Sequence, residues 1–331
     1  MAAYTGIQGQ NILIVSSDPA NPTEGQIWYN STTNLLKGSA FAPGSWASGG
    51  NMNTARRGIF ASGGGTQTAS IAAGGYSTTS APGFTELYNG TSWTSNPTGL
   101  NTGRYLGAGF GTQTAYIGAG GYSFPGSTSH NQTESWNGST WTNLPATLSS
   151  NIFNIAGTGT QTAGIVVGYG TTANQLWNGS TWTTNPVTMN STNLNSRAVS
   201  GTQTSAIATG GASPTGASSN SESYNGSAWT STSSINTARY FLGASGNSNT
   251  SALIFGGNRS PGPAYNTSTE SWNGTAWSNE NSLSTSRNSM GSAGTQTSAL
   301  ASGGQTTGDG VIATTEEWTG AGAVTKTITT S

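Results

Sequence analysis

The residues that most often carry out catalysis or bind metals are scarce in this sequence of 331 residues. It contains one histidine, His130, and no cysteine, which excludes thiolate metal sites, multi-histidine metal sites and triads built on Cys-His or on two histidines. Asp18 and Asp309 are its only aspartates, which removes most calcium-loop patterns. His130 stands in a polar loop, where we expect a solvated side chain. We therefore expect neither a metal nor a cofactor.

Two further patterns, paired carboxylates and glycine-rich phosphate loops, also fail to indicate a catalytic site. Glu316 and Glu317 would point to opposite faces of a strand, which argues against a glycosidase pair. The glycines of 118–121 precede neither a helix nor a lysine, so turn or strand glycine is a better interpretation than a phosphate loop. We expect a protein that is not an enzyme. An enzyme of unknown type that acts on polysaccharide through an isolated glutamate stays as a third alternative.

The few charged residues recur in register. Arginines precede the first strand of most repeats, at Arg56 or Arg57, Arg104, Arg197, Arg239 and Arg287. Glutamates stand two residues before the first aromatic of a hairpin, at Glu86, Glu134, Glu222, Glu270 and Glu316. In the third repeat Gln175 replaces the glutamate, and no arginine occurs around Asn151. This joint loss predicts structural Arg–Glu ties within each repeat, since the guanidinium fork matches a carboxylate. A ring of carboxylates that serves acid catalysis or binds ions is the less favoured alternative.

The hairpins that carry these glutamates share the pattern aromatic-Asn-Gly-x-x-Trp. Full copies begin at Tyr88, Trp136, Trp177, Tyr224 and Trp272, and an eroded copy begins at Trp318. Asn-Gly favours a tight hairpin turn because both residues tolerate positive φ. A turn between the two aromatics places them opposite each other on one face. The Asn-x-Ser/Thr sequons at these turns are explained by the turn itself.

A second marker, Gly-Thr-Gln-Thr, has the same period. It begins at Gly65, Gly111, Gly159, Gly201 and Gly294, with a degenerate copy at Gly246. The two markers predict six units of four antiparallel strands, an all-β fold that forms a six-bladed β-propeller. Residues 46–56 resemble 93–104, so we expect an N-terminal strand to complete the last blade and close the ring. The alternating tail 324–329 is expected to add to that closing sheet.

Residues 1–40 do not fit the repeat. Residues 25–37 read as two short strands around a polar turn. One hairpin of this size is not stable alone, so we expect the segment to pack on another surface. The sequence predicts an attachment or oligomerisation segment at 1–40, followed by the propeller at 41–331.

Charge and hydropathy limit the partners and the location. The net charge is -1, with 9 Lys plus Arg, so no basic surface for nucleic acid is expected. The apolar run 12–15 is too short to span a bilayer, and we expect no membrane insertion. The N-terminus lacks the pattern of a secretory signal, which favours synthesis in a cytosol without export by that route.

Three recurring features together resemble kelch repeats over residues 41–331. They are the arginine before the first strand, a Gly-Gly pair after the second strand, as at 120–121, and the two downstream aromatics. The third repeat departs from this pattern at 168–170. Some kelch-like enzymes of the galactose oxidase type use copper with histidine and tyrosine ligands and a Tyr–Cys link. Because this chain has one histidine and no cysteine, the copper-dependent oxidase activity is not expected of it. It also lacks the Asp-box turns that are typical of sialidases.

The Gly/Ser/Thr/Asn-rich composition and residues 21–30 look like bacteriophage tail-fibre and other appendage proteins. This resemblance implies a virion structural protein that is assembled in the host cytoplasm. It would contact other virion proteins through residues 1–40, form a homo-oligomer and display the propeller for adhesion to the host surface or to its glycans. The alternative is an extracellular, secreted or surface bacterial protein with a lectin-like propeller.

Receptor-binding residues are expected in the loops between the second and third strands of each repeat, because these loops vary most. They are 76–85, 122–132, 212–221, 258–268 and 305–315. The side chains there that are able to stack on a sugar or hydrogen-bond with it are Tyr122, Phe124, His130, Arg259 and Tyr265.

Overall fold

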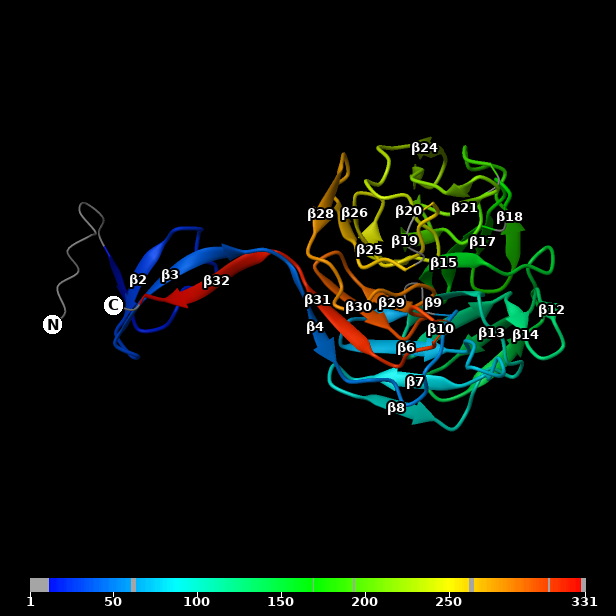
Figure 1. Cartoon of the computed structure of the whole chain (residues 1–331), viewed down its shortest axis with the longest axis horizontal. Coiled ribbons are helices and arrows are strands. Elements are labelled where there is room, and N and C mark those ends of the chain that lie inside the picture. Colours follow the sequence, from blue (N-terminus) through cyan, green and yellow to red (C-terminus); the bar gives the residue numbers. More distant parts are fainter. Residues whose placement is uncertain are drawn as a thin grey trace. The chain divides into compact units, whose positions relative to one another are not determined.

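The structure is a computed structural model, in which residues 12–60, 64–168, 170–192, 194–261, 265–308 and 310–328 are described (Figure 1). Asp309 and Thr329 lie outside these residues. The chain divides into two compact units: unit 1 comprises Met1–Gly44 with Gly320–Ser331, and unit 2 comprises Ser45–Thr319. All regular elements of the described residues are strands, as expected for an all-β protein. No helix in the described part of the chain is long and apolar enough to cross a membrane.

Unit 1 holds one four-stranded sheet in the order β1-β2-β3-β32. Its strands are β1 (Leu13–Val15), β2 (Ile27–Asn30), β3 (Leu35–Ala42) and β32 (Gly322–Thr327). The hairpin expected over 25–37 is present as β2 and β3. The expectation that the tail 324–329 adds to the closing sheet of the propeller is wrong. β32 instead pairs with β3, from Lys37↔Thr327 to Ala42↔Gly322, because β3 offers a long free edge. In unit 2 the corresponding place beside β31 is already taken by β4 (Ser45–Gly49).

The core of unit 1 is small. Trp28 and Leu36 are its buried hydrophobic side chains among the described residues. The indole Nε1 of Trp28 donates to Asp18 Oδ1 at 3.0 Å, and Lys37 forms an ion pair with Asp18 at 2.7 Å. A buried tryptophan and a polar cluster around one carboxylate therefore hold this sheet together.

The described part of unit 2 holds six four-stranded antiparallel sheets, which we number in chain order. Sheet 1 consists of β5 (Gly65–Thr66), β6 (Ala69–Ala73), β7 (Thr85–Tyr88) and β8 (Trp93–Asn96). Sheet 2 consists of β9 (Ala108–Thr112), β10 (Ala115–Ala119), β13 (Thr133–Trp136) and β14 (Trp141–Leu144). Sheet 3 consists of β15 (Ile155–Thr160), β16 (Ala163–Gly168), β17 (Gln175–Trp177) and β18 (Trp182–Thr184).

Sheet 4 consists of β19 (Ala198–Thr202), β20 (Ser205–Thr209), β23 (Ser221–Tyr224) and β24 (Trp229–Ser231). Sheet 5 consists of β25 (Gly243–Ser248), β26 (Ser251–Phe255), β27 (Thr269–Trp272) and β28 (Trp277–Glu280). Sheet 6 consists of β29 (Gly291–Gly294), β30 (Ser298–Ser302), β31 (Thr315–Thr319) and β4 (Ser45–Gly49). Two ribbons, β11 (Tyr122–Ser123) with β12 (Thr128–Ser129) and β21 (Ala212–Ser213) with β22 (Gly216–Ala217), extend the connections of sheets 2 and 4.

The aromatic pairs of the hairpins lie directly opposite each other, as predicted. Trp136 pairs with Trp141 across β13 and β14, and their ring centroids are 5.5 Å apart. The turn differs from the expectation, because among these Asn-Gly pairs only the glycine has positive φ, as at Gly138 (95°). Asn137 instead uses its side chain: Oδ1 accepts hydrogen bonds from the backbone N–H groups of Ser139 and Thr140 at 3.0 and 2.9 Å. The asparagine thus stabilises the turn as an Asx turn.

The sheets are arranged with their first strands innermost. In Figure 1 the strands β8, β14, β18, β24 and β28 lie at the edge of unit 2, and β9, β15, β19, β25 and β29 lie towards its middle. The first strands contact one another in chain order, and β29 also contacts β5. The N-terminal strand β4 completes sheet 6 by pairing with β31, which places Trp46 opposite Trp318. The architecture is that of a β-propeller-like all-β protein.

The glutamine of each Gly-Thr-Gln-Thr loop ties its sheet to the preceding one. Gln113 Nε2 donates to the carbonyl oxygens of Ser70 and Tyr88 in sheet 1 at 3.0 and 2.6 Å. Gln67 makes the same pair of contacts with Ala299 and Trp318 of sheet 6, at 3.0 and 2.7 Å. These bonds satisfy carbonyl groups at the ends of the neighbouring strands, so the repeat encodes contacts between sheets as well as within them.

Candidate functional site

Six residues at equivalent positions form a circuit of backbone hydrogen bonds in the middle of unit 2. Each has a φ between 50° and 61° and stands in the connection that leads to the first strand of its sheet: Gly58, Leu106, Asn154, Ser196, Phe241 and Ser289. The N–H of each donates to the carbonyl of the preceding member at 2.7–3.0 Å, and the N–H of Gly58 donates to Ser289. All six line a small hollow of about 50 Å³. The circuit fixes the direction in which the neighbouring side chains leave the backbone.

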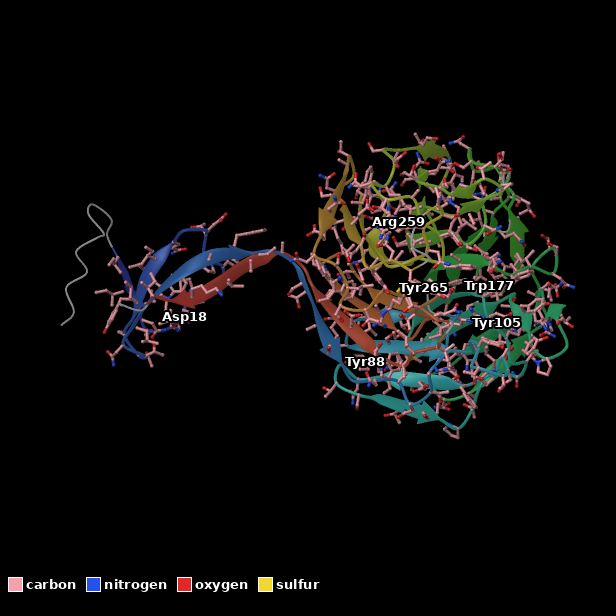
Figure 2. All side chains as sticks on the ribbon, in the orientation of Figure 1. Asp18, Tyr88, Tyr105, Trp177, Arg259 and Tyr265 are labelled. Carbon is pink, nitrogen blue, oxygen red and sulfur yellow. The ribbon has the colours of Figure 1, made fainter. Side chains whose placement is uncertain are left out.

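A larger hollow of about 320 Å³ lies over part of this circuit, and we call it the central hollow. Its lining includes three tyrosines, three side-chain amides and one arginine: Tyr105, Tyr240, Tyr265, Asn258, Asn288, Gln305 and Arg57. Figure 2 shows Tyr265 near the middle of unit 2. The volume is at the lower end of the range of about 300–1,000 Å³ for small-molecule sites. Aromatic rings next to amides provide faces for stacking together with donors and acceptors.

The repeat itself positions these side chains. Asn288 and Gln305 exchange backbone hydrogen bonds of 3.0 Å, and Tyr240 and Asn258 do the same at 3.0 and 2.7 Å. One partner of each pair stands directly before a member of the circuit, and the other directly follows a Gly-Gly pair. Asn288 Nδ2 also donates to Asn258 Oδ1 at 2.6 Å. Equivalent positions of successive sheets therefore meet around one opening.

Arg57 connects the central hollow to a series of aromatic rings. Its guanidinium donates to Gln305 Oε1 and lies 5.1 Å from the ring centroid of Tyr76. Four further ring pairs continue from Tyr76 with centroid distances of 5.0–5.8 Å: Tyr76–Tyr105, Tyr105–Tyr122, Tyr122–Phe153 and Tyr76–Phe124. Burial raises the pKa of Tyr105, although Arg57 opposes this shift. The Tyr105 phenol is therefore protonated and able to donate at neutral pH.

The structure separates the five receptor candidates predicted from the sequence. Tyr265 lines the central hollow, and Tyr122 and Phe124 belong to the aromatic series. His130 and Arg259 are not among the described residues that line the hollow. Burial lowers the pKa of His130, with the charge of Arg104 as a second cause, so the imidazole is neutral at pH 7.

Most of the lining escaped the sequence analysis, namely Arg57, Tyr105, Tyr240, Asn258, Asn288 and Gln305. Some of them lie outside the variable loops. A signal was nevertheless present: Arg57, Tyr105, Tyr240 and Asn288 each directly follow the arginine before a first strand. A position next to a repeated structural residue, yet variable in type, is where a repeat protein can gather binding side chains.

The repeated arginines and glutamates form buried ion pairs in five sheets. The N–O distances are 2.7–2.9 Å for Arg56–Glu86, Arg104–Glu134, Arg197–Glu222, Arg239–Glu270 and Arg287–Glu316. Burial lowers the pKa of each arginine, and the facing glutamate opposes the shift. Each carboxylate also accepts two backbone N–H groups from the connection that leads into its sheet, as Glu134 does from Asn101 and Thr102. These carboxylates are satisfied inside the fold, which fits a structural role, although Nε of Arg56, Arg197, Arg239 and Arg287 is buried without a hydrogen-bond partner in the described part of the chain.

Two sheets depart from this arrangement. Arg197 directly follows the circuit residue Ser196, whereas the other four arginines stand two residues before their circuit residues. In sheet 3 the tie is absent: Ile152 and Gln175 occupy the two positions, and Gln175 Oε1 accepts the backbone N–H of Ser149 at 3.0 Å. The neutral amide of Gln175 thus accepts the same kind of backbone hydrogen bond that the glutamate carboxylates accept in the other sheets. In the described part of the chain, no group of three or more His, Cys, Asp or Glu side chains is placed to hold a metal ion.

No family model matches the sequence, and no curated protein matches it. The fold does have relatives among solved structures, of which 216 chains match. One of them is the structure of YjhT, with a TM-score of 0.66 and 11% sequence identity. That match covers 83% of this chain and 99% of YjhT. At this identity the likeness concerns the fold, and it agrees with a β-propeller-like architecture.

Proposed function

We propose that unit 2 is a six-bladed, kelch-like propeller whose ring is closed by β4. The support comes from contacts that return to their starting point. The backbone circuit ends with Gly58 bonded to Ser289, and Gln67 joins sheet 1 to sheet 6 as Gln113 joins sheet 2 to sheet 1. The strand β4 supplies the fourth strand of sheet 6 from the other end of the sequence.

The propeller is a carbohydrate-binding module without catalytic activity. The observation that carries this proposal is the central hollow, in which Tyr105, Tyr240 and Tyr265 stand among the amides of Asn258 and Asn288. Sugar rings present apolar faces to aromatic side chains and hydroxyl groups to amides. No described carboxylate lines the hollow, so no paired acid and base face a glycosidic bond there.

The chain acts as a virion structural protein, in a tail fibre or another appendage, and binds glycans of the host surface. Residues 21–30 and the Gly/Ser/Thr/Asn-rich composition favour this context. Unit 1 supports it physically, because its described core contains two buried hydrophobic side chains while Leu13, Ile14 and Phe41 are 49%, 71% and 56% exposed. So small a core needs further burial to be stable. We assign that burial to other virion proteins and to further copies of this chain.

A glycan array probed with the full chain tests the binding proposal. We expect binding to a defined set of glycans, and clearly weaker binding to them when Tyr240, in the central hollow, is replaced by alanine. Binding that persists unchanged in Tyr240→Ala would overturn the assignment of the hollow. Cryo-electron microscopy of the native source tests the context: symmetric copies on a particle, with unit 1 covered by other subunits, are expected, whereas a free monomer would favour the secreted lectin-like alternative.

A further inference from the structure

Sheet 3 contains a hollow where five other sheets hold a buried Arg–Glu pair. Its volume is about 230 Å³. The described residues that line it include Ser149, Ile152, Ile155, Val166, Asn174 and Gln175. None of them lines the central hollow. We call this second space the sheet 3 hollow.

The sheet 3 hollow arises from two departures from the repeat. Ile152 stands three residues after Ser149, just as Arg104 stands three residues after Asn101. Gln175 is paired with Val166 across the sheet, as Glu134 is paired with Gly118. Isoleucine is shorter than arginine and cannot reach the amide of Gln175 with a donor. The space that a guanidinium fills elsewhere is therefore left open.

Of the two largely buried amide side chains in this hollow, Gln175 has a polar atom without a hydrogen-bond partner among the described residues. Gln175 is 8% exposed, and its Oε1 accepts the N–H of Ser149 at 3.0 Å, while its Nε2 donates to no described group. Both polar atoms of the neighbouring Asn174 side chain have a partner, since Nδ2 donates to the carbonyl oxygen of Val187 at 2.9 Å and Oδ1 accepts from Asn185 at 2.7 Å. Gln175 Nε2 is not among the described buried polar atoms without a partner, so this donor reaches solvent from the lining of the hollow and is available to a ligand or a water there.

The rest of the described lining decides the chemistry of the ligand. Ile155 and Val166 provide an apolar wall, and no described charged side chain lines the space. A charged ligand would be desolvated without a partner. The fitting ligand is neutral and small, and it carries an acceptor oxygen next to an apolar group of about methyl size.

We propose that the sheet 3 hollow binds the acetamido group of an N-acetylated amino sugar. The acetamido carbonyl accepts the Gln175 Nε2–H, and its methyl group contacts Ile155 and Val166. The site is separate from the central hollow and does not depend on it. An N-acetylated glycan would then have two places of contact on one propeller.

The test is a titration of the full chain with N-acetylglucosamine, monitored through the side-chain amide NMR signals of Gln175. We expect a saturable shift with N-acetylglucosamine and none with glucose, which lacks the acetamido group. The double variant Ile152→Arg/Gln175→Glu rebuilds the pair found in the other sheets and fills the hollow. Because this variant lacks the Gln175 amide, its binding is measured by calorimetry, and we expect an affinity at least tenfold lower than that of the unmodified chain.

Two controls keep the result unambiguous. Ile152→Phe fills the hollow without adding charge and is expected to abolish the shift even if the double variant does not fold. Tyr240→Ala, in the central hollow, should leave the Gln175 shift unchanged, so this proposal and the proposed function can fail separately. The inference is overturned if N-acetylglucosamine causes no saturable shift, if glucose causes the same shift, or if the filled variants bind as tightly as the unmodified chain.

Discussion

The backbone N–H of Gly58 donates to the carbonyl oxygen of Ser289 at 2.7 Å, joining the connection into sheet 1 to the connection into sheet 6. The two residues are far apart in sequence, yet this bond repeats the geometry of Leu106 with Gly58 at 2.8 Å. Neighbours in the chain and the two ends of the array thus use the same contact. This equivalence supports the proposal that the six sheets form a closed ring.

The first prediction concerns this junction. In Gln67→Ala, the two hydrogen bonds to Ala299 and Trp318 and the one accepted from Ser298 Oγ are lost, and two carbonyl groups of sheet 6 lose a donor. We expect a loss of unfolding free energy of about 1–3 kcal/mol, measured by urea denaturation. Gln161→Ala, which removes the equivalent contacts between sheets 2 and 3, is the matched control and should cost a similar amount. No effect of Gln67→Ala alongside a clear effect of Gln161→Ala would show that the ring is open at this junction.

The second prediction concerns the buried ion pairs. Arg104→Met leaves the carboxylate of Glu134 buried without its partner and removes donors to the carbonyl groups of Gly120 and Gln132. We expect it to lower the free energy of unfolding by about 3–5 kcal/mol. Arg104→Met/Glu134→Gln should recover part of that loss, because the unpaired charge is gone. A single variant that costs less than the double variant would contradict the buried-pair interpretation.

The same ion pairs show what the sequence could reveal. The sequence predicts that Arg and Glu are partners, because both are absent from sheet 3. It also predicts the aromatic pairs, because a fixed spacing of five residues sets their register across the hairpin. The central hollow was harder to predict. Its residues Arg57, Tyr105, Tyr240 and Asn288 share a structural position but differ in residue type, so no repeated motif in the sequence indicates that they meet. The pairing of β32 with β3 depends on which strand edge remains open, and that is decided by the assembled sheets.

The third prediction concerns pH and unit 1. Hydrogen bonds from Lys37, Trp28 and Asn30 lower the pKa of Asp18 from 3.8 to about 2. Because the folded pKa is depressed, this carboxylate stabilises unit 1 above pH 4, and the contribution is lost as the pH falls from about 4 to about 2. The indole N–H signal of Trp28 in NMR spectra reports the change, since this group donates to Asp18. In Asp18→Asn the signal should lose most of its dependence on pH in this window; an unchanged titration would assign the effect to another group.

The fourth prediction concerns the central hollow. Tyr240 lines it at one of the positions just before the circuit, and Tyr240→Ala removes a ring that would stack on a sugar. Burial of one large apolar side chain contributes about 1.5–3 kcal/mol, and about 1.4 kcal/mol corresponds to a tenfold change in affinity, so we expect the affinity for the best glycan of the array to fall about tenfold in calorimetry. Phe84→Ala is the matched control, because this ring is 51% exposed and lies outside the hollow. Glycan affinity should be unchanged in the control, and both variants should unfold at similar denaturant concentrations. Equal losses of affinity in the two variants would mean that binding does not take place in the central hollow.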